Sequence, residues 1–191
     1  MNTPSHAIIN LALGDAIFSR YRWAIVLGAI LPDIPIFIFY GWAKSIANLS
    51  EKEIWTQAYW QPGIQNWVAL FHSLPLAAIA AVVAWKSGQK TLLAFCLSLI
   101  LHSFLDLPVH HDDAHRHFFP FSNYRFISPF SYWDPNHYGT IVAAIELLSV
   151  LAATIYLFGV LDSRIAKGVL IATNLLYAIA YFRFYLSSLL S

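Results

Sequence analysis

Long apolar stretches separated by short polar segments dominate the chain. Four of them cover roughly residues 64–84, 91–107, 140–160 and 165–187. Each is about long enough to cross a ~30 Å hydrocarbon core as a helix, with the stretch 91–107 at the short limit. The pattern predicts an all-α fold, a polytopic membrane helical bundle with about four to five spans.

The apolar stretch 23–42 is interrupted at Asp33, which two prolines flank. Prolines break a helix, and irregular backbone at membrane depth persists only against protein or a cavity. We therefore expect residues 5–19 and 22–31 to form an N-terminal helical hairpin that returns Asp33 to the side of His6. A plain spanning helix with a proline kink is the alternative.

A polar segment with several aromatic residues follows this stretch. Ser50 and Glu53 have the spacing of a capping box, and the apolar residues after them share much of one helix face. The segment 50–60 is therefore expected to be a short helix lying in the membrane interface.

Basic residues gather at both ends of the predicted spans, in unequal numbers. One end receives Arg20, Arg22, Lys86, Lys90, Arg164 and Lys167, and the other receives Lys44, Lys52, Arg116 and Arg125. Because basic residues favour the cytoplasmic side, we expect the segments 43–63 and 108–139 to lie outside the cytoplasm.

The composition agrees with a membrane protein. Of the 191 residues, 59% are hydrophobic and 11% are charged, whereas soluble domains carry about 25% charged residues. The net charge of +1 excludes a strongly basic nucleic-acid binder. The single cysteine, Cys96, excludes an internal disulfide framework. Membrane lipids are the expected partners, and nucleic acid is not.

Candidate chemistry begins with His102 and Asp106. They are four residues apart in the predicted helix 91–107, so their side chains share a face. This spacing suits two metal ligands, or one ligand and the carboxylate that orients it. A lone histidine in an apolar helix is more often a core residue, so the pair does not decide by itself.

The segment 110–117 packs four histidines and two aspartates into eight residues. If it is helical, His111 and His115 share a face; if it is extended, His115 and His117 do. Imidazole and carboxylate together suit zinc, manganese or iron, whereas the alternative is a solvated polar loop. His137, further along, is either a ligand or a surface residue.

Polar residues on independent segments fall in one layer of the predicted bundle. At 1.5 Å per residue, His72 lies about 12 Å and Glu146 about 9 Å from the outer ends of their spans. His102 and Asp106 lie in the last turns of theirs, and the hairpin adds two more polar residues. Ionisable residues inside a membrane are functional candidates by default. The layer predicts a buried, metal-bearing site with an outer mouth.

The segment 118–139 is rich in aromatic residues and contains three prolines. It is expected to form a lid, an apolar wall for an acyl chain, or a loop resting on lipid headgroups. Arg116 and Arg125 suit a phosphate held by bidentate contacts. The alternative is that they pair with Asp112 or Asp134.

Four short motifs appear in a characteristic order: Ser5-His6, Gly28-Ala29-Ile30-Leu31-Pro32-Asp33-Ile34, Phe71-His72-Ser73 and Leu101-His102-Ser103-Phe104-Leu105-Asp106. Together they resemble the bacterial inner-membrane family of predicted metal-dependent hydrolases over roughly residues 1–140. The order of His, Asp, His and HxxxD is also distantly similar to zinc-dependent phospholipase C and single-strand nucleases, which are all-α enzymes with clustered zinc ions. The later HxxxE pair of that group is missing, and Glu146 is only a loose substitute.

The motifs and the resemblance together predict one membrane-embedded, metal-dependent hydrolase-like domain over residues 1–191. A divalent metal, zinc first with manganese or iron as alternatives, would activate water and polarise an ester or phosphoester. The expected ligands are His6, Asp33, His72, His102, Asp106, His111 and His115. Asp112 or Asp113 is the expected general base, His117 a further ligand or acid, and Arg116 and Arg125 are expected to bind substrate.

The expected substrate is an ester or phosphoester of a lipid or amphiphile, because the site would open near the headgroups. Two other functions stay open: an ion or metal transporter or channel, and a non-catalytic membrane protein with a structural metal. The expected location is the bacterial inner membrane, with the site toward the outer face.

Overall fold

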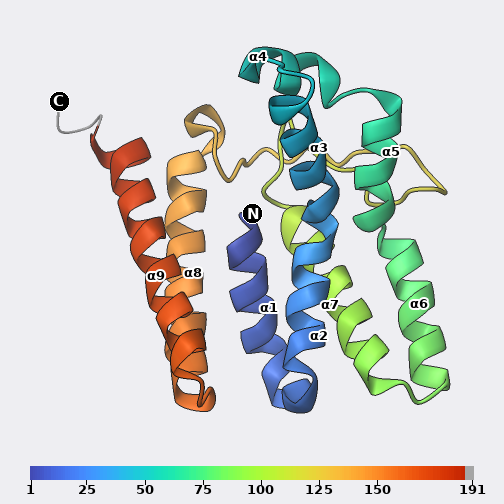
Figure 1. Ribbon diagram of the computed structural model, residues 1–191, viewed down its shortest axis with the longest axis vertical. Coiled ribbons are helices and arrows are strands. Elements are labelled where there is room, and N and C mark those ends of the chain that lie inside the picture. Colours follow the sequence, from blue (N-terminus) through green and yellow to red (C-terminus); the bar gives the residue numbers. More distant parts are fainter. Residues whose placement is uncertain (188–191) are drawn as a thin grey trace.

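The computed structural model describes residues 1–187, which form helices and no strand (Figure 1). In chain order the elements are α1 (Thr3–Phe18), η1 (Ser19–Tyr21), α2 (Arg22–Ile30), η2 (Leu31–Asp33), α3 (Ile34–Ser45), α4 (Glu51–Glu53), η3 (Ile54–Ala58), α5 (Pro62–Phe71), α6 (Leu74–Lys86), α7 (Lys90–Asp106), η4 (Pro135–His137), α8 (Gly139–Val160), α9 (Arg164–Tyr181) and η5 (Phe182–Leu186).

The first two helices form the expected hairpin. α1 and α2 pack against each other in opposite directions, and the short turn η1 joins them at one end of the bundle (Figure 1). Thr3 Oγ1 at the start of α1 donates a hydrogen bond of 2.5 Å to Asp33 Oδ2. This bond confirms that the hairpin returns Asp33 to the side on which the chain starts.

Two of the helices are broken where they pass each other. α2 continues into α3 through the turn η2, and α5 gives way to α6 at His72 and Ser73. Ser73 caps the new helix, because its Oγ accepts a hydrogen bond of 3.2 Å from Leu76 N. Asp33 Oδ1 lies 3.6 Å from His72 Nε2, so the two breaks meet inside the bundle, where irregular backbone is tolerated.

Four segments of the described chain are long and apolar enough to cross a membrane: Thr3–Ser45, Pro62–Lys86, Gly139–Val160 and Arg164–Leu186. The last three match expected spans, and the first contains the hairpin. The expected span over 91–107 is not among them. Its helix, α7, has 17 residues, a length of about 26 Å, and ends at the buried Asp106.

α7 packs between α2 and α6 and also touches α1. Gly28 permits the closest approach of α2, because a Cβ at this position would lie 2.4 Å from the backbone oxygen of Phe95. Ser98 Oγ donates to Ile25 O at 2.7 Å, and Asn10 Nδ2 donates to Ser98 O at 2.9 Å. Each such hydrogen bond contributes about 1 kcal/mol, so these polar contacts help to hold α1, α2 and α7 together.

The two ends of the bundle differ. The α1–α2, α6–α7 and α8–α9 turns lie at one end, and the segments 46–61 and 107–138 lie at the other (Figure 1). At this second end the expected helix over 50–60 is present. It starts with the capping box of Ser50 and Glu53 and continues as one π-helical turn, Ile54–Ala58.

Candidate metal centre

Four segments that are far apart in sequence bring polar side chains together inside the bundle. α1 contributes His6, the α2–α3 break Asp33 and the α5–α6 break His72, while the end of α7 contributes His102 and Asp106. The three histidines have no exposed surface, and Asp106 is 1% exposed. All five belong to the expected ligand set.

Backbone carbonyls fix the protonation of the two central histidines. His72 Nδ1 lies 2.9 Å from Val68 O, and His102 Nδ1 lies 2.6 Å from Ala29 O. A carbonyl only accepts, so each Nδ1 carries the proton and each Nε2 presents a lone pair. Neither buried Nε2 has a hydrogen-bond partner. Lone pairs that face carboxylate oxygens in this way call for a cation between them.

Several distances between these donor atoms are of the size found around a metal ion. Asp33 Oδ1 lies 3.6 Å from both His72 Nε2 and His102 Nε2. Asp106 Oδ2 lies 3.1 Å from His102 Nε2 and 3.9 Å from His72 Nε2. Tetrahedral coordination with bonds of ~2.0–2.2 Å separates neighbouring ligand atoms by about 3.3–3.6 Å. Asp33, His72 and His102 therefore form one possible metal-binding group, with Asp106 beside it.

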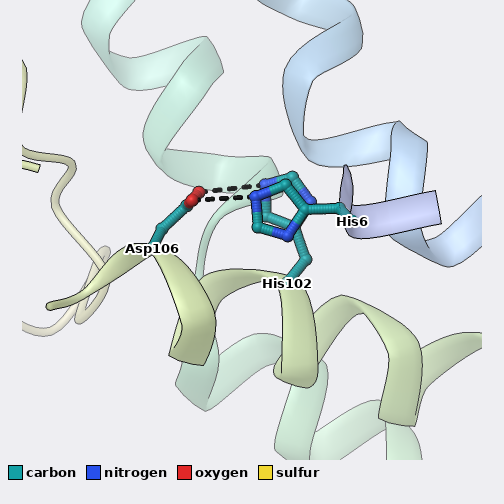
Figure 2. Close-up of side chains that lie close together, drawn as sticks. All are labelled: His6, His102 and Asp106. Atoms are coloured by element: carbon teal, nitrogen blue, oxygen red, sulfur yellow. Dashed lines mark hydrogen bonds and ion pairs between the residues drawn. The ribbon is translucent and has the colours of Figure 1, made fainter. Parts of the chain in front are cut away.

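Asp106 presents its other oxygen to a second group of donors. Oδ1 lies 2.8 Å from His6 Nε2, 3.2 Å from His110 Nε2 and 2.7 Å from the Met1 nitrogen. Figure 2 shows the rings of His6 and His102 stacked, with their centroids 3.7 Å apart, and both directed toward the carboxylate. His6, His102 and Asp106 form one possible metal-binding group; Asp33, His72 and His102 form another. His102 belongs to both groups, and Asp106 Oδ2 lies 3.1 Å from its Nε2.

The segment 107–117 adds His115 and His117 from the open side. His115 forms a third possible metal-binding group with His72 and Asp106. His117 Nδ1 lies 3.4 Å from His72 O, and the backbone oxygen of His117 accepts from Leu74 N at 2.9 Å. Burial lowers the pKa of His115 well below its usual value, and it lowers the pKa of His117 to about 4. Both rings are neutral at pH 7 and able to donate a lone pair.

The pKa of His110 shifts in the opposite direction. Burial disfavours its charged form, but the nearby carboxylates of Asp106 and Asp113 outweigh that effect and raise its pKa to about 9. Its Nδ1 lies 3.0 Å from Asp113 Oδ2. His110 therefore lies between the carboxylates of Asp106 and Asp113, and its Nε2 also lies 3.0 Å from the Met1 nitrogen.

An open pocket of about 650 Å³ lies over the donors. Its polar wall contains Asp33, His110, Asp112, Asp113 and His115, and its aromatic wall contains Phe37, Trp55, Tyr59, Trp60, Tyr132 and Trp133. Tyr132 and Trp133 belong to the aromatic segment 118–139, which thus supplies part of the wall. We refer to this pocket as the chamber; it gives water and a ligand access to the centre.

Three expected site residues lie elsewhere. His111 stacks on His137 with ring centroids 3.6 Å apart, and its Nδ1 is bonded to Ser128 O rather than to the centre. Arg116 donates to Asn66 and Asn123, and Arg125 donates to Gln65 Oε1 and Ala114 O. Neither arginine pairs with Asp112 or Asp134. Both guanidinium groups instead hold the segment 107–138 against the region around α5.

Two residues near the centre, His110 and Ser103, were not predicted from the sequence. His110 belongs to the histidine-rich segment, but its spacing to Asp106 crosses a helix end, so no periodic pattern marked it. Ser103 Oγ donates to His72 O at 3.1 Å and so supports the α5–α6 break. Each of these histidines is followed by a serine, in His72-Ser73 and His102-Ser103. This repeated pair is the sequence feature from which the supporting contacts could have been predicted.

Comparisons of the chain with protein families, with curated proteins and with solved structures found no match. The chemistry of the centre consequently rests on its own geometry: buried imidazole lone pairs, two carboxylates and an open chamber.

Proposed function

We propose that the protein is an integral membrane metal-dependent hydrolase that acts on an ester or phosphoester of a lipid or amphiphile. The observation that carries the proposal is the combination of two buried Nε2 atoms that have no hydrogen-bond partner with two carboxylates, one of which, Asp33, lines an open chamber. A purely structural ion needs a closed shell, whereas catalysis needs an open position.

Each residue then has a distinct role. Asp33, His72 and His102 would hold a divalent ion, with zinc as the first candidate, and Asp106, His6 and His115 would supply further donors. When bound, such an ion polarises the substrate and makes water nucleophilic near pH 7. Asp113 lines the chamber and its Oδ1 is buried without a partner. We assign it the general base, with Asp112 as the alternative and His117 as a further ligand or acid.

The substrate class follows from the surroundings of the chamber. Trp55, Trp60 and Trp133 line it and are also partly exposed at its mouth. Tryptophan prefers the boundary between water and lipid, so the mouth lies at headgroup level. This position favours an amphiphile. The charge distribution supports a bacterial inner membrane with the mouth outside, as does the resemblance to the inner-membrane hydrolase family.

The test is hydrolysis by purified protein in nanodiscs, loaded with zinc and offered a chromogenic phosphoester, a chromogenic ester and a fluorescent phospholipid. We expect Asp106→Asn and His102→Gln to lower the rate at least about a hundredfold. Asp15→Asn is the matched control, because Asp15 is also buried but pairs with Arg22 at the other end of α1.

Two results would contradict the proposal. Zinc uptake into proteoliposomes without hydrolysis would indicate a transporter. Tightly bound zinc with neither uptake nor hydrolysis, together with a shell that lacks a water ligand by X-ray absorption, would indicate a structural metal.

A further inference from the structure

A second pocket of about 480 Å³ lies beside the chamber, between α8, α9 and the segment 132–135. Aromatic side chains dominate its wall: Tyr132, Trp133, Tyr177, Tyr181, Phe184 and Tyr185. Tyr185 hydroxyl donates to Trp133 O at 3.0 Å, which closes the wall at the end of α9. We call this the aromatic pocket.

Glu146 of α8 also lines the aromatic pocket, and it is 5% exposed. Its Oε1 accepts hydrogen bonds from Asn2 N and Asn2 Nδ2, both at 2.9 Å, and from Ser5 Oγ at 2.5 Å. Its Oε2 is buried and has no partner. Asn2 and Ser5 therefore satisfy one oxygen of this carboxylate, whereas the other oxygen has no hydrogen-bond partner.

The lining of the aromatic pocket contains no lysine, arginine or histidine. A buried carboxylate is costly unless a positive charge or hydrogen-bond donors compensate it, and no cationic side chain of the pocket compensates Oε2. Faces of tyrosine and tryptophan attract cations as well. We propose that the aromatic pocket binds a primary ammonium group, with Glu146 as its counter-charge.

The unpaired oxygen selects between kinds of ammonium. Oε2 lacks a donor, and a primary ammonium carries three N–H donors. A quaternary ammonium carries none and would leave the buried Oε2 without a hydrogen-bond donor. The pocket therefore fits R–NH₃⁺ better than R–N(CH₃)₃⁺.

The aromatic pocket adjoins the chamber. Asn2, Tyr132 and Trp133 line both. Two hydrogen bonds and one residue of backbone connect Asp106 Oδ1 to Glu146 Oε1 through Met1 and Asn2, a path of at most about 9 Å. An amine bound here would thus present the rest of its molecule to the metal centre. The inference goes beyond hydrolysis, because the amine needs neither metal nor turnover to bind.

The test uses ethylammonium and tetramethylammonium as probes, titrated by calorimetry into metal-free protein in nanodiscs of phosphatidylglycerol, a lipid without an amine. Glu146→Gln removes the charge and keeps an acceptor for Asn2 and Ser5. Ala180→Phe fills the pocket and leaves Glu146 unchanged. Glu51→Gln is the control, since it removes an equal charge from an exposed site that pairs with Lys44.

We expect ethylammonium to bind the wild type at least about tenfold more tightly than either Glu146→Gln or Ala180→Phe, a difference of about 1.4 kcal/mol. Glu51→Gln should match the wild type, and tetramethylammonium should bind the wild type at least about tenfold more weakly than ethylammonium. The proposal is overturned by absence of ethylammonium binding, by wild-type affinity in Glu146→Gln or Ala180→Phe, or by a preference for tetramethylammonium.

A second titration identifies the source of the amine. In nanodiscs that contain a phospholipid with an aminoethyl headgroup, competition by the lipid would weaken ethylammonium binding about tenfold or more. Unchanged binding assigns the pocket to a soluble amine. Because both titrations omit metal, a failure of the hydrolase proposal would leave their result intact, and the reverse holds too.

Discussion

Asp106→Asn is the most informative substitution at the centre. Asp106 is 1% exposed, and its two oxygens face donors on both sides. Oδ2 lies 3.1 Å from His102 Nε2, and Oδ1 lies 2.8 Å from His6 Nε2. An amide has the same shape but only one acceptor and no charge, so it cannot serve both sides. We expect the variant to lose its metal.

The size of the effect follows from the position of Asp106. Loss of a residue that only orients a ligand lowers metal affinity about 10–100-fold. Asp106 belongs to two of the three possible metal-binding groups, so its loss should exceed the upper end of that range. We therefore expect zinc affinity to fall by more than about 100-fold, or more than about 2.7 kcal/mol.

The assay is zinc content by elemental analysis after dialysis against a series of buffered free-zinc concentrations, with circular dichroism to verify the fold. Asp15→Asn should keep the wild-type zinc affinity. If Asp106→Asn unfolds, His102→Gln replaces it, since the loss of a donor nitrogen predicts the same direction. Folded Asp106→Asn with zinc affinity within tenfold of the wild type would refute the assignment of the centre.

Three further predictions concern the packing at Gly28, the choice between His115 and His111, and the contact of Arg125. Gly28→Ala should lower the free energy of unfolding by about 1–3 kcal/mol, as overpacking does, whereas Gly41→Ala, with nothing near its Cβ, should not; thermal unfolding in detergent measures both. His115→Ala should weaken zinc binding and His111→Ala should leave it unchanged, because only His115 lies among the donors; equal effects in the same zinc titration would contradict this. Arg125→Gln should lower the unfolding midpoint by removing the contact with Gln65 while zinc affinity stays constant, and a midpoint equal to that of the wild type would show that the contact is not stabilising.

Much of the helical framework could be predicted because the apolar stretches are long. The hairpin was also predictable, since the polar residues Ser19, Arg20 and Arg22 lie at its turn, whereas α2 continues past the prolines around Asp33 into α3 as the kinked alternative expects. The length of α7 was harder to interpret. At 17 residues α7 lies at the short limit of a spanning helix, so its apolar stretch does not distinguish a full span from a shorter helix packed between α2 and α6.

The candidate site was predictable where residues lie on helices or at helix breaks. His72, His102 and Asp106 could be placed by depth alone. The segment 107–117 has no regular period, so its backbone path decides which histidines turn inward. His110 and His115 do so, whereas His111 turns to His137. The contacts of Arg116 and Arg125 could not be predicted either. Their partners are uncharged amide groups, so no pattern of opposite charges in the sequence indicates these contacts.

The wide separation of the donors in sequence has a consequence for biosynthesis. His6 and Asp106, which touch in the folded protein, are 100 residues apart. At a synthesis rate of about 5–20 residues per second, roughly 5–20 seconds pass between them. During that interval the hairpin already exists, but the donors on α7 and beyond do not. A metal ion that needs all of these ligands can therefore bind only after most of the chain has been synthesised. Metal binding is thus a late step in the biosynthesis of each molecule.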